Sequence, residues 1–328
     1  MQSVFDIQEM ANRGRTDRIL IVGVGRTGST WVKNALEKTP GTISWNEPDN
    51  IDASRDPDEA FGTSGFGPYP IIDPDDPGSV HRALWDVVFK SGLTHTQLRQ
   101  MTPYLRPFLK LPKPILHPLV KAGGAALSVM PNKNQRNIAK TIYSCFSIEW
   151  IVKNYDPQVI VTQRHPYSVI ASWRELDMPK FDLLTRPELL KRYGDQFGGN
   201  PPTASDSELT QAAWIVGLQT AALGAAAEKH PEWVIVNHED LCVDPVEKFR
   251  ALCKVVHIPW SDKVAEFLET SNRPGKGLVT NRVASEQVDK WRRVLKSDEV
   301  EEIASVLNRF PNYGWVAKPD NWIELIKH

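Results

Sequence analysis

The sequence has little cysteine, no excess of either charge and no long apolar run. Only three cysteines occur among 328 residues, and their spacing fits neither a zinc site nor a disulfide framework. Lysine and arginine total 39 against 40 aspartates and glutamates, so a general nucleic-acid binder, which is usually basic, is not expected. The low cysteine content is typical of a reducing compartment, and we expect a cytoplasmic protein.

Segments that could enter a membrane are also scarce. Residues 1–18 mix acidic and basic side chains and contain no apolar stretch, so a secretory signal is not predicted. The longest candidate run, 212–227, is interrupted by Gln219 and is too short for a span, so we expect a buried helix there. An apolar share of 41% predicts a globular protein with a sizeable core.

Short apolar runs alternate with helical patterns along the chain. Runs at 19–22, 159–162 and 233–236 are continuous in the way of strands buried on both faces, and 42–45 is a further strand candidate. This alternation predicts an α/β fold of three layers, a P-loop-like arrangement with a central parallel sheet and helices on both faces. We expect one domain over 1–328.

The segment from about 49 to 138 interrupts the alternation and predicts an irregular insertion after the second strand. Its first part is rich in Asp, Pro and Gly, whereas its second part is basic and contains five prolines between 103 and 118. We interpret it as a lid around an acceptor pocket. A packed or solvated insertion is favoured over contact of the basic half, 90–140, with an anionic membrane or glycolipid.

Local signals also predict where helices begin. Pro166 suits the first turn of a helix after the 159–162 strand. Ser205 and Glu208 have the spacing of a capping box for a helix that ends near Lys229.

A glycine-rich turn, 23–30, lies between a predicted strand and a predicted helix. Its glycines let successive backbone N–H groups face one anion, and the helix N-terminus adds partial positive charge. The glycine spacing matches a dinucleotide fingerprint, with Glu47 near the place of a ribose-binding acid. A Walker A loop would need a lysine where Ser29 stands. The cation of this loop is Arg26 instead, inside the turn.

The loop resembles the 5′-phosphosulfate loop of sulfotransferases, in which a basic residue precedes Ser/Thr-Gly-Ser/Thr-Thr-Trp. The arginine at its first position is similar to carbohydrate and bacterial members of that family. The resemblance implies that the 5′-phosphosulfate of 3′-phosphoadenosine-5′-phosphosulfate (PAPS) is held by Arg26, Thr27, Gly28, Ser29 and Thr30. It also implies that Trp31 stacks on the adenine, with a core position on an amphipathic helix as the alternative.

A second motif runs from Gln163 to Ser172. It resembles the family's 3′-phosphate motif, with Arg164, a proline two residues later and Ser172 eight residues later. The arginine fork binds a phosphate in a bidentate manner. A dinucleotide dehydrogenase has no need of this motif, so the two motifs together favour a sulfotransferase.

Two basic residues near the C-terminus extend the resemblance. Lys276 and Arg282 lie where the family often has a basic phosphate-binding loop. Solvated surface charge is the alternative for both.

The general base of the cytosolic relatives is missing. Those proteins carry a histidine directly after Lys-Thr, and this chain has Ile142 after Lys140 and Thr141. Glu47 is the candidate replacement, because its Glu-Pro pair resembles members with a carboxylate base; a surface or helix-capping acid is the alternative. By the same resemblance Arg26 stabilises charge on the sulfuryl group and Lys140 assists the leaving group.

The sequence therefore predicts an enzyme that moves a sulfuryl group from PAPS to an acceptor hydroxyl, giving PAP and a sulfate ester. A sugar, glycolipid or secondary metabolite is the expected acceptor. No metal is needed, and the eight histidines show no ligand spacing. An NAD(P)-dependent oxidoreductase of Rossmann type and a non-catalytic nucleotide-binding protein are the alternatives.

Overall fold

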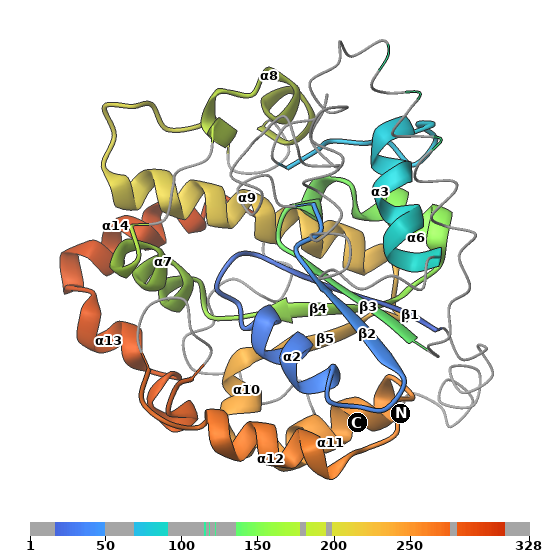
Figure 1. Cartoon of the computed structure of the whole chain (residues 1–328). Coiled ribbons are helices and arrows are strands. Elements are labelled where there is room, and N and C mark those ends of the chain that lie inside the picture. Colours follow the sequence, from blue (N-terminus) through green and yellow to red (C-terminus); the bar gives the residue numbers. More distant parts are fainter. Residues whose placement is uncertain are drawn as a thin grey trace, which may run out of the picture.

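The computed structural model describes residues 17–49, 69–90, 115, 118, 122, 136–177, 182–194, 199–275 and 281–311. Within these residues a five-stranded sheet has the order β2-β3-β1-β4-β5, and every neighbouring pair of strands is parallel (Figure 1). The strands are β1 (Arg18–Gly23), β2 (Thr42–Asn46), β3 (Arg136–Thr141), β4 (Gln158–Gln163) and β5 (Val234–Asn237). The predicted parallel sheet is thereby confirmed.

Helices cover both faces of the sheet (Figure 1). One face carries α2 (Ser29–Leu36), α10 (His238–Val243), α11 (Pro245–Val255) and α12 (Asp262–Ser271). The other carries α3 (Ser79–Lys90), α6 (Ile148–Tyr155), α7 (Pro166–Glu175), α9 (Glu208–Lys229) and α14 (Ser297–Leu307). Shorter helical segments are η2 (Ser144–Phe146), η3 (Asp182–Thr185), α8 (Pro187–Leu189), η4 (Leu190–Gly194), η5 (Ala284–Glu286) and α13 (Lys290–Val294).

The central strand β1 shows why the sheet needs cover on both sides. Ile19 and Ile21 pack into the core beneath α2 and α11, whereas Leu20 and Val22 pack into the core beneath α9. Successive side chains of a strand point to opposite faces, so a continuous apolar run requires two cores. The three-layer α/β fold is the result.

The start of α9 differs from the prediction. Ser207, and not Ser205, caps the helix, because its Oγ accepts from the N–H of Thr210 at 3.0 Å. The Ser205 hydroxyl pairs instead with Thr203 at 2.7 Å, in the turn before the helix. The helix itself ends at Lys229 as predicted.

Between β2 and β3 the structure describes part of the predicted insertion. Trp85 of α3 is buried in the same core as α9, so this part packs against the main body. The lid prediction for the rest of 49–138, including most of the basic half, lies outside the described residues. No helix in the described part of the chain combines the length and apolar character needed to span a membrane.

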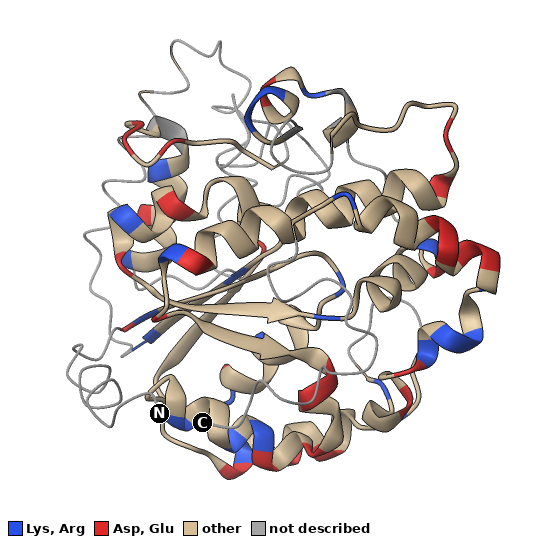
Figure 2. Cartoon of the chain, turned by 180° about the vertical axis from the view of Figure 1, so that it is seen from behind, with Lys and Arg blue, Asp and Glu red and all other residues tan. Residues whose placement is uncertain are grey.

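The outer helices carry both signs of charge. Basic and acidic residues are interspersed along α11 and α12 on the outside of the lower layer (Figure 2). Mixed charge of this kind is typical of a solvated surface. The groups discussed next lie at the carboxyl ends of the strands.

Candidate active site

The turn between β1 and α2 is shaped by two close approaches. Gly28 has a φ of +87°, and a Cβ on it would lie 2.5 Å from Cδ2 of His238. A Cβ on Gly23 would lie 2.3 Å from Oγ1 of Thr162 on the neighbouring strand. Since real Cβ atoms do not approach other atoms so closely, glycine is required at both positions.

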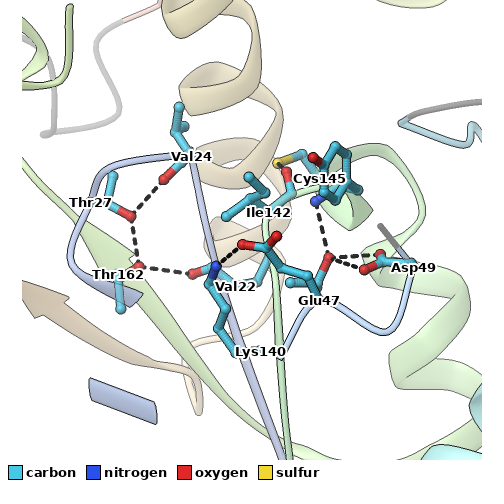
Figure 3. Close-up of polar contacts among 11 residues, drawn as sticks. Val22, Val24, Thr27, Glu47, Asp49, Lys140, Ile142, Cys145 and Thr162 are labelled. Carbon is cyan, nitrogen blue, oxygen red and sulfur yellow. Dashed lines mark hydrogen bonds and ion pairs between the residues drawn. The ribbon is translucent and has the colours of Figure 1, made fainter. Parts of the chain in front are cut away.

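Thr27 braces this turn from within. Its hydroxyl donates to the carbonyl of Val24 at 2.7 Å and lies 2.8 Å from Oγ1 of Thr162, as Figure 3 shows. Its N–H also bonds to Val24 O, at 3.2 Å. The contribution of Thr27 is therefore to hold the turn in shape.

The first amides of α2 remain available to an anion. The helical hydrogen bonds begin with the N–H groups of Trp31 and Val32, which both donate to Gly28 O. No acceptor among the described residues takes the N–H groups of Ser29 and Thr30. The first turn of a helix presents such amides toward anionic groups.

Three arginines gather beside the turn. Arg26 has a φ of +77° and donates from Nε to Ser172 Oγ at 3.1 Å. Arg164 donates to the carbonyl oxygens of Arg26 and Gln287, both at 3.3 Å. Burial lowers the pKa of Arg26, and the charges of Arg164 and Arg282 lower it further. The structure thus brings together four residues predicted from the two phosphate motifs and the C-terminal basic pair.

The Arg164 side chain is partly buried. Its Nε is buried and has no hydrogen-bond partner among the described residues. Burial lowers its pKa, whereas the charge of Glu239 opposes that effect. Glu239 in turn accepts from the N–H of His165 at 3.0 Å, which ties α10 to the end of β4. A pocket lined by the turn, the end of β4, α7 and α9 adjoins this arginine. A buried, partly unsatisfied cation fits an anionic group of a nucleotide.

Trp31 has features of both predicted positions, a core residue on α2 and a platform for the adenine. Its ring meets Phe249 edge-on at 5.0 Å and lies 6.0 Å from His238, at the border of the lower core. The side chain is only partly buried. Stacking of its exposed part on adenine stays a prediction. Lys276 lies outside the described residues.

A second group of residues lies at the ends of β2 and β3. Asn46 pairs with Lys140 in the sheet, and the N–H of Glu47 extends this ladder to Lys140 O at 2.6 Å. The Lys140 ammonium forms an ion pair with Glu47 Oε1 (Figure 3). Lys140 is 2% exposed and Glu47 is 17% exposed, so the carboxylate is the outer member of the pair.

The electrostatics connect this pair to the arginines. Burial lowers the pKa of Lys140, while the charges of Glu47 and Asp49 oppose the shift. The charge of Glu47 also opposes the lowering of the Arg26 pKa. Ile142 lies beside the same turn, since its Cδ1 would be 3.5 Å from a Cβ on Gly25. The position of the missing histidine is thus apolar, and a carboxylate lies within electrostatic reach of the loop cation.

Several residues of the site carry no sequence signal. Trp173 donates from Nε1 to the carbonyl of Gly25 at 3.0 Å, which anchors the turn to α7. Asp49 accepts from the hydroxyls of Thr141 and Ser144. A tryptophan or a loop aspartate at these places is unremarkable until the chain folds. The described residues contain no group of three or more His, Cys, Asp or Glu placed to hold a metal ion.

The fold is thus a three-layer α/β fold with an arginine-lined turn after β1. Residues 18–262 match the model of the sulfotransferase family, so the chain belongs to that family and is an enzyme of that class. Residues 18–262 include both phosphate motifs and the Glu47–Lys140 pair. No curated protein matches the chain.

Solved structures of similar fold include other sulfotransferases. The sulfotransferase domain from the curacin biosynthetic pathway is 13% identical, with 88% of this chain and 96% of that chain covered and a TM-score of 0.46. Sulfotransferase STF9 from Mycobacterium avium is 14% identical, with 94% and 80% covered and a TM-score of 0.41. Mouse sulfotransferase SULT7A1, complexed with PAP, is 11% identical, with 93% and 89% covered and a TM-score of 0.39.

Proposed function

We propose that this sulfotransferase moves the sulfuryl group of PAPS to an acceptor hydroxyl whose proton is taken by Glu47. The observation that carries the proposal is the position of the Glu47–Lys140 pair. It lies at the carboxyl edge of the sheet, where open parallel sheets bind ligands. A carboxylate there can take a proton as the new bond forms.

The arginine cluster supports binding of a nucleotide with anionic groups at both the 3′ and the 5′ position of its ribose. Arg26 and the first amides of α2 suit the 5′-phosphosulfate, and Arg164, Ser172 and Arg282 suit the 3′-phosphate. After burial, the charges of Arg164 and Arg282 lower the pKa of Arg26, and the charge of Arg282 lowers that of Arg164; this is a repulsion that a polyanion relieves. ADP and NADH both lack the 3′-phosphate, so neither can relieve this repulsion as fully.

In the proposed reaction the acceptor oxygen attacks the sulfur atom, and the bond between sulfur and the 5′-phosphate oxygen breaks. The acceptor proton passes to Glu47, and PAP leaves with the electron pair. Arg26 stabilises the charge that develops on the sulfuryl oxygens, as cations do in related phosphoryl transfer. The contact of the Lys140 ammonium with Glu47 favours a role in orienting the base over direct assistance to the leaving group.

The acceptor class follows from the resemblance of the arginine loop and the Glu-Pro pair to carbohydrate and bacterial members. We propose a sugar, glycolipid or secondary-metabolite hydroxyl. A panel of such acceptors with radiolabelled PAPS identifies it. A protein that binds PAP but transfers sulfate to none of them would be a non-catalytic nucleotide-binding protein.

Replacement of Glu47 by Gln tests the base directly. The amide keeps the shape but does not take a proton, so turnover should fall about 10²–10⁴-fold. The affinity for PAP, measured by calorimetry, should stay unchanged. Glu247→Gln, on the outer helix α11, is the control for loss of one acidic charge. If Glu47→Gln turns over at the wild-type rate, the base assignment is wrong.

A further inference from the structure

We propose that Asp49 is a positioning residue, which holds Glu47 in its reactive geometry by binding the hydroxyls of Thr141 and Ser144. The inference rests on the proposed role of Glu47 as base. The effect of Asp49 would pass through the backbone that joins it to Glu47.

The backbone of Glu47 needs such support. Its φ is +49°, in the left-handed region, and the next residue is Pro48. A side chain with a Cβ is unfavourable there by about 1–2 kcal/mol, and a following proline restricts the backbone further. Strained residues persist only where the surrounding structure fixes them.

Asp49 provides that constraint on the far side of the proline. Thr141 Oγ1 lies 2.8 and 2.6 Å from the two carboxylate oxygens, and Ser144 Oγ donates to Oδ2 at 2.6 Å. On the near side, the N–H of Glu47 donates to Lys140 O at 2.6 Å. The strained residue is therefore held between two attachments to the end of β3.

The end of β3 is itself fixed by the same hydroxyl. Thr141 Oγ1 accepts from the N–H of Tyr143 at 3.0 Å while it donates to Asp49. Thr141 directly follows Lys140, so the carboxylate clamp and the ion pair start from adjacent residues. A shift of Thr141 would therefore also move Lys140 and its ion pair with Glu47.

The charges explain why the hydroxyls matter. Asp49 is 4% exposed, and burial raises the pKa of its carboxyl, while the bonds from Ser144 and Thr141 oppose that shift. The negative charges of Glu47 and Asp49 both stabilise the charged Lys140 ammonium. Because the hydroxyls of Thr141 and Ser144 donate hydrogen bonds to Asp49, the Lys140 ammonium can form its ion pair with Glu47.

A set of variants tests this arrangement. Thr141→Val removes the hydroxyl but keeps the shape, and Asp49→Asn removes the charge. Each should lower kcat by about 10²-fold, the loss typical of a reacting group displaced by about 1 Å. The affinity for PAP should not change. Thr141→Ser keeps a hydroxyl at this position and should therefore retain most of the wild-type kcat. Thr39→Val, which removes a buried hydroxyl at the other end of β2, should leave kcat unchanged.

A double-mutant cycle separates positioning from a general structural role. Asp49→Asn should cost little further turnover in a Glu47→Gln background, because the base it positions is already absent. An equal loss in both backgrounds would overturn the inference and leave the base assignment intact. A wild-type rate for Glu47→Gln alone would overturn both. If Asp49→Asn does not fold, the same cycle is run with Thr141→Val.

Discussion

Arg26 donates a 3.1 Å hydrogen bond to Ser172, although we propose that the two residues bind different anionic groups of PAPS. The bond joins the turn after β1 to helix α7. Trp173, the next residue of α7, bonds to the carbonyl of Gly25 in the same turn. The two phosphate motifs are thereby coupled through one face of α7.

This coupling predicts non-additive effects on PAP binding. Ser172→Ala removes a donor to a charged ligand and the partner of Arg26, so it should weaken PAP binding by about 1.5–3 kcal/mol. In an Arg26→Ala background the loss should be smaller, with a coupling energy of about 0.5–3 kcal/mol. Calorimetry on the four proteins of the cycle measures it. Strict additivity would show that the two motifs act separately.

Arg164 should bind the 3′-phosphate of PAP. Arg164→Lys removes the bidentate fork, so we expect a loss of about 1.5–3 kcal/mol in PAP affinity. ADP lacks the 3′-phosphate and should bind both proteins with similar affinity. Titration of both ligands, with thermal unfolding as a check on the fold, gives the comparison. Equal losses for PAP and ADP would assign Arg164 to support of the turn through Arg26 O.

The two glycines of the turn should respond differently to alanine. Gly28→Ala places a Cβ 2.5 Å from His238 at a left-handed φ, so the free energy of unfolding should fall by at least about 1–2 kcal/mol. Gly25→Ala meets Ile142 only at 3.5 Å, an ordinary contact, and should change stability by about 0.5 kcal/mol or less. Urea unfolding compares them. Equal stabilities would show that the Gly28 backbone relaxes freely.

Protonation of His165 should account for part of the loss of folding stability at acid pH. Burial first, then the charge of Arg292, lower its pKa from 6.5 to about 4. Between these values the unfolded chain binds a proton that the folded chain excludes, so stability is full above pH 6.5 and falls as the pH drops toward 4. His165→Asn keeps an acceptor for the Tyr167 N–H but does not titrate. The loss of unfolding free energy between pH 7 and pH 5 should be smaller in this variant, and an unchanged loss would contradict the assignment.

Short sequence patterns predict those structural features that are determined by residues close together in the sequence. The strands predicted at 19–22, 42–45, 159–162 and 233–236, the glycine turn and the start of α7 at Pro166 are such features, and all are present. The pairing of Glu47 with Lys140 was not predicted, because β3 has no continuous apolar run and begins at Arg136, inside the predicted insertion. The cap of α9 was placed two residues early, since both Ser205 and Ser207 have suitable side chains.

The supporting contacts could not be predicted in this way. The Trp173–Gly25 bond, the Asp49 clamp and the Glu239–His165 bond each join residues that are 74 or more positions apart. Their partners are set by strand order and helix packing, which a single sequence does not encode in any local pattern. The positive φ values of Arg26 and Glu47 have the same origin, because tertiary contacts hold conformations that local preference disfavours.

The strand order also bears on how the chain is made. β1 lies between β3 and β4, and β2 pairs with β3, so within the described residues the sheet partners of β1 and β2 are synthesised after residue 135. While the ribosome makes the segment between β2 and β3, the partners that β1 has in the folded sheet are not yet available to it. Unpaired apolar strands of this kind are exposed to aggregation. Slow translation of 47–135, or a shortage of chaperones that shield nascent chains, should therefore reduce the yield of folded enzyme more than its final stability would suggest.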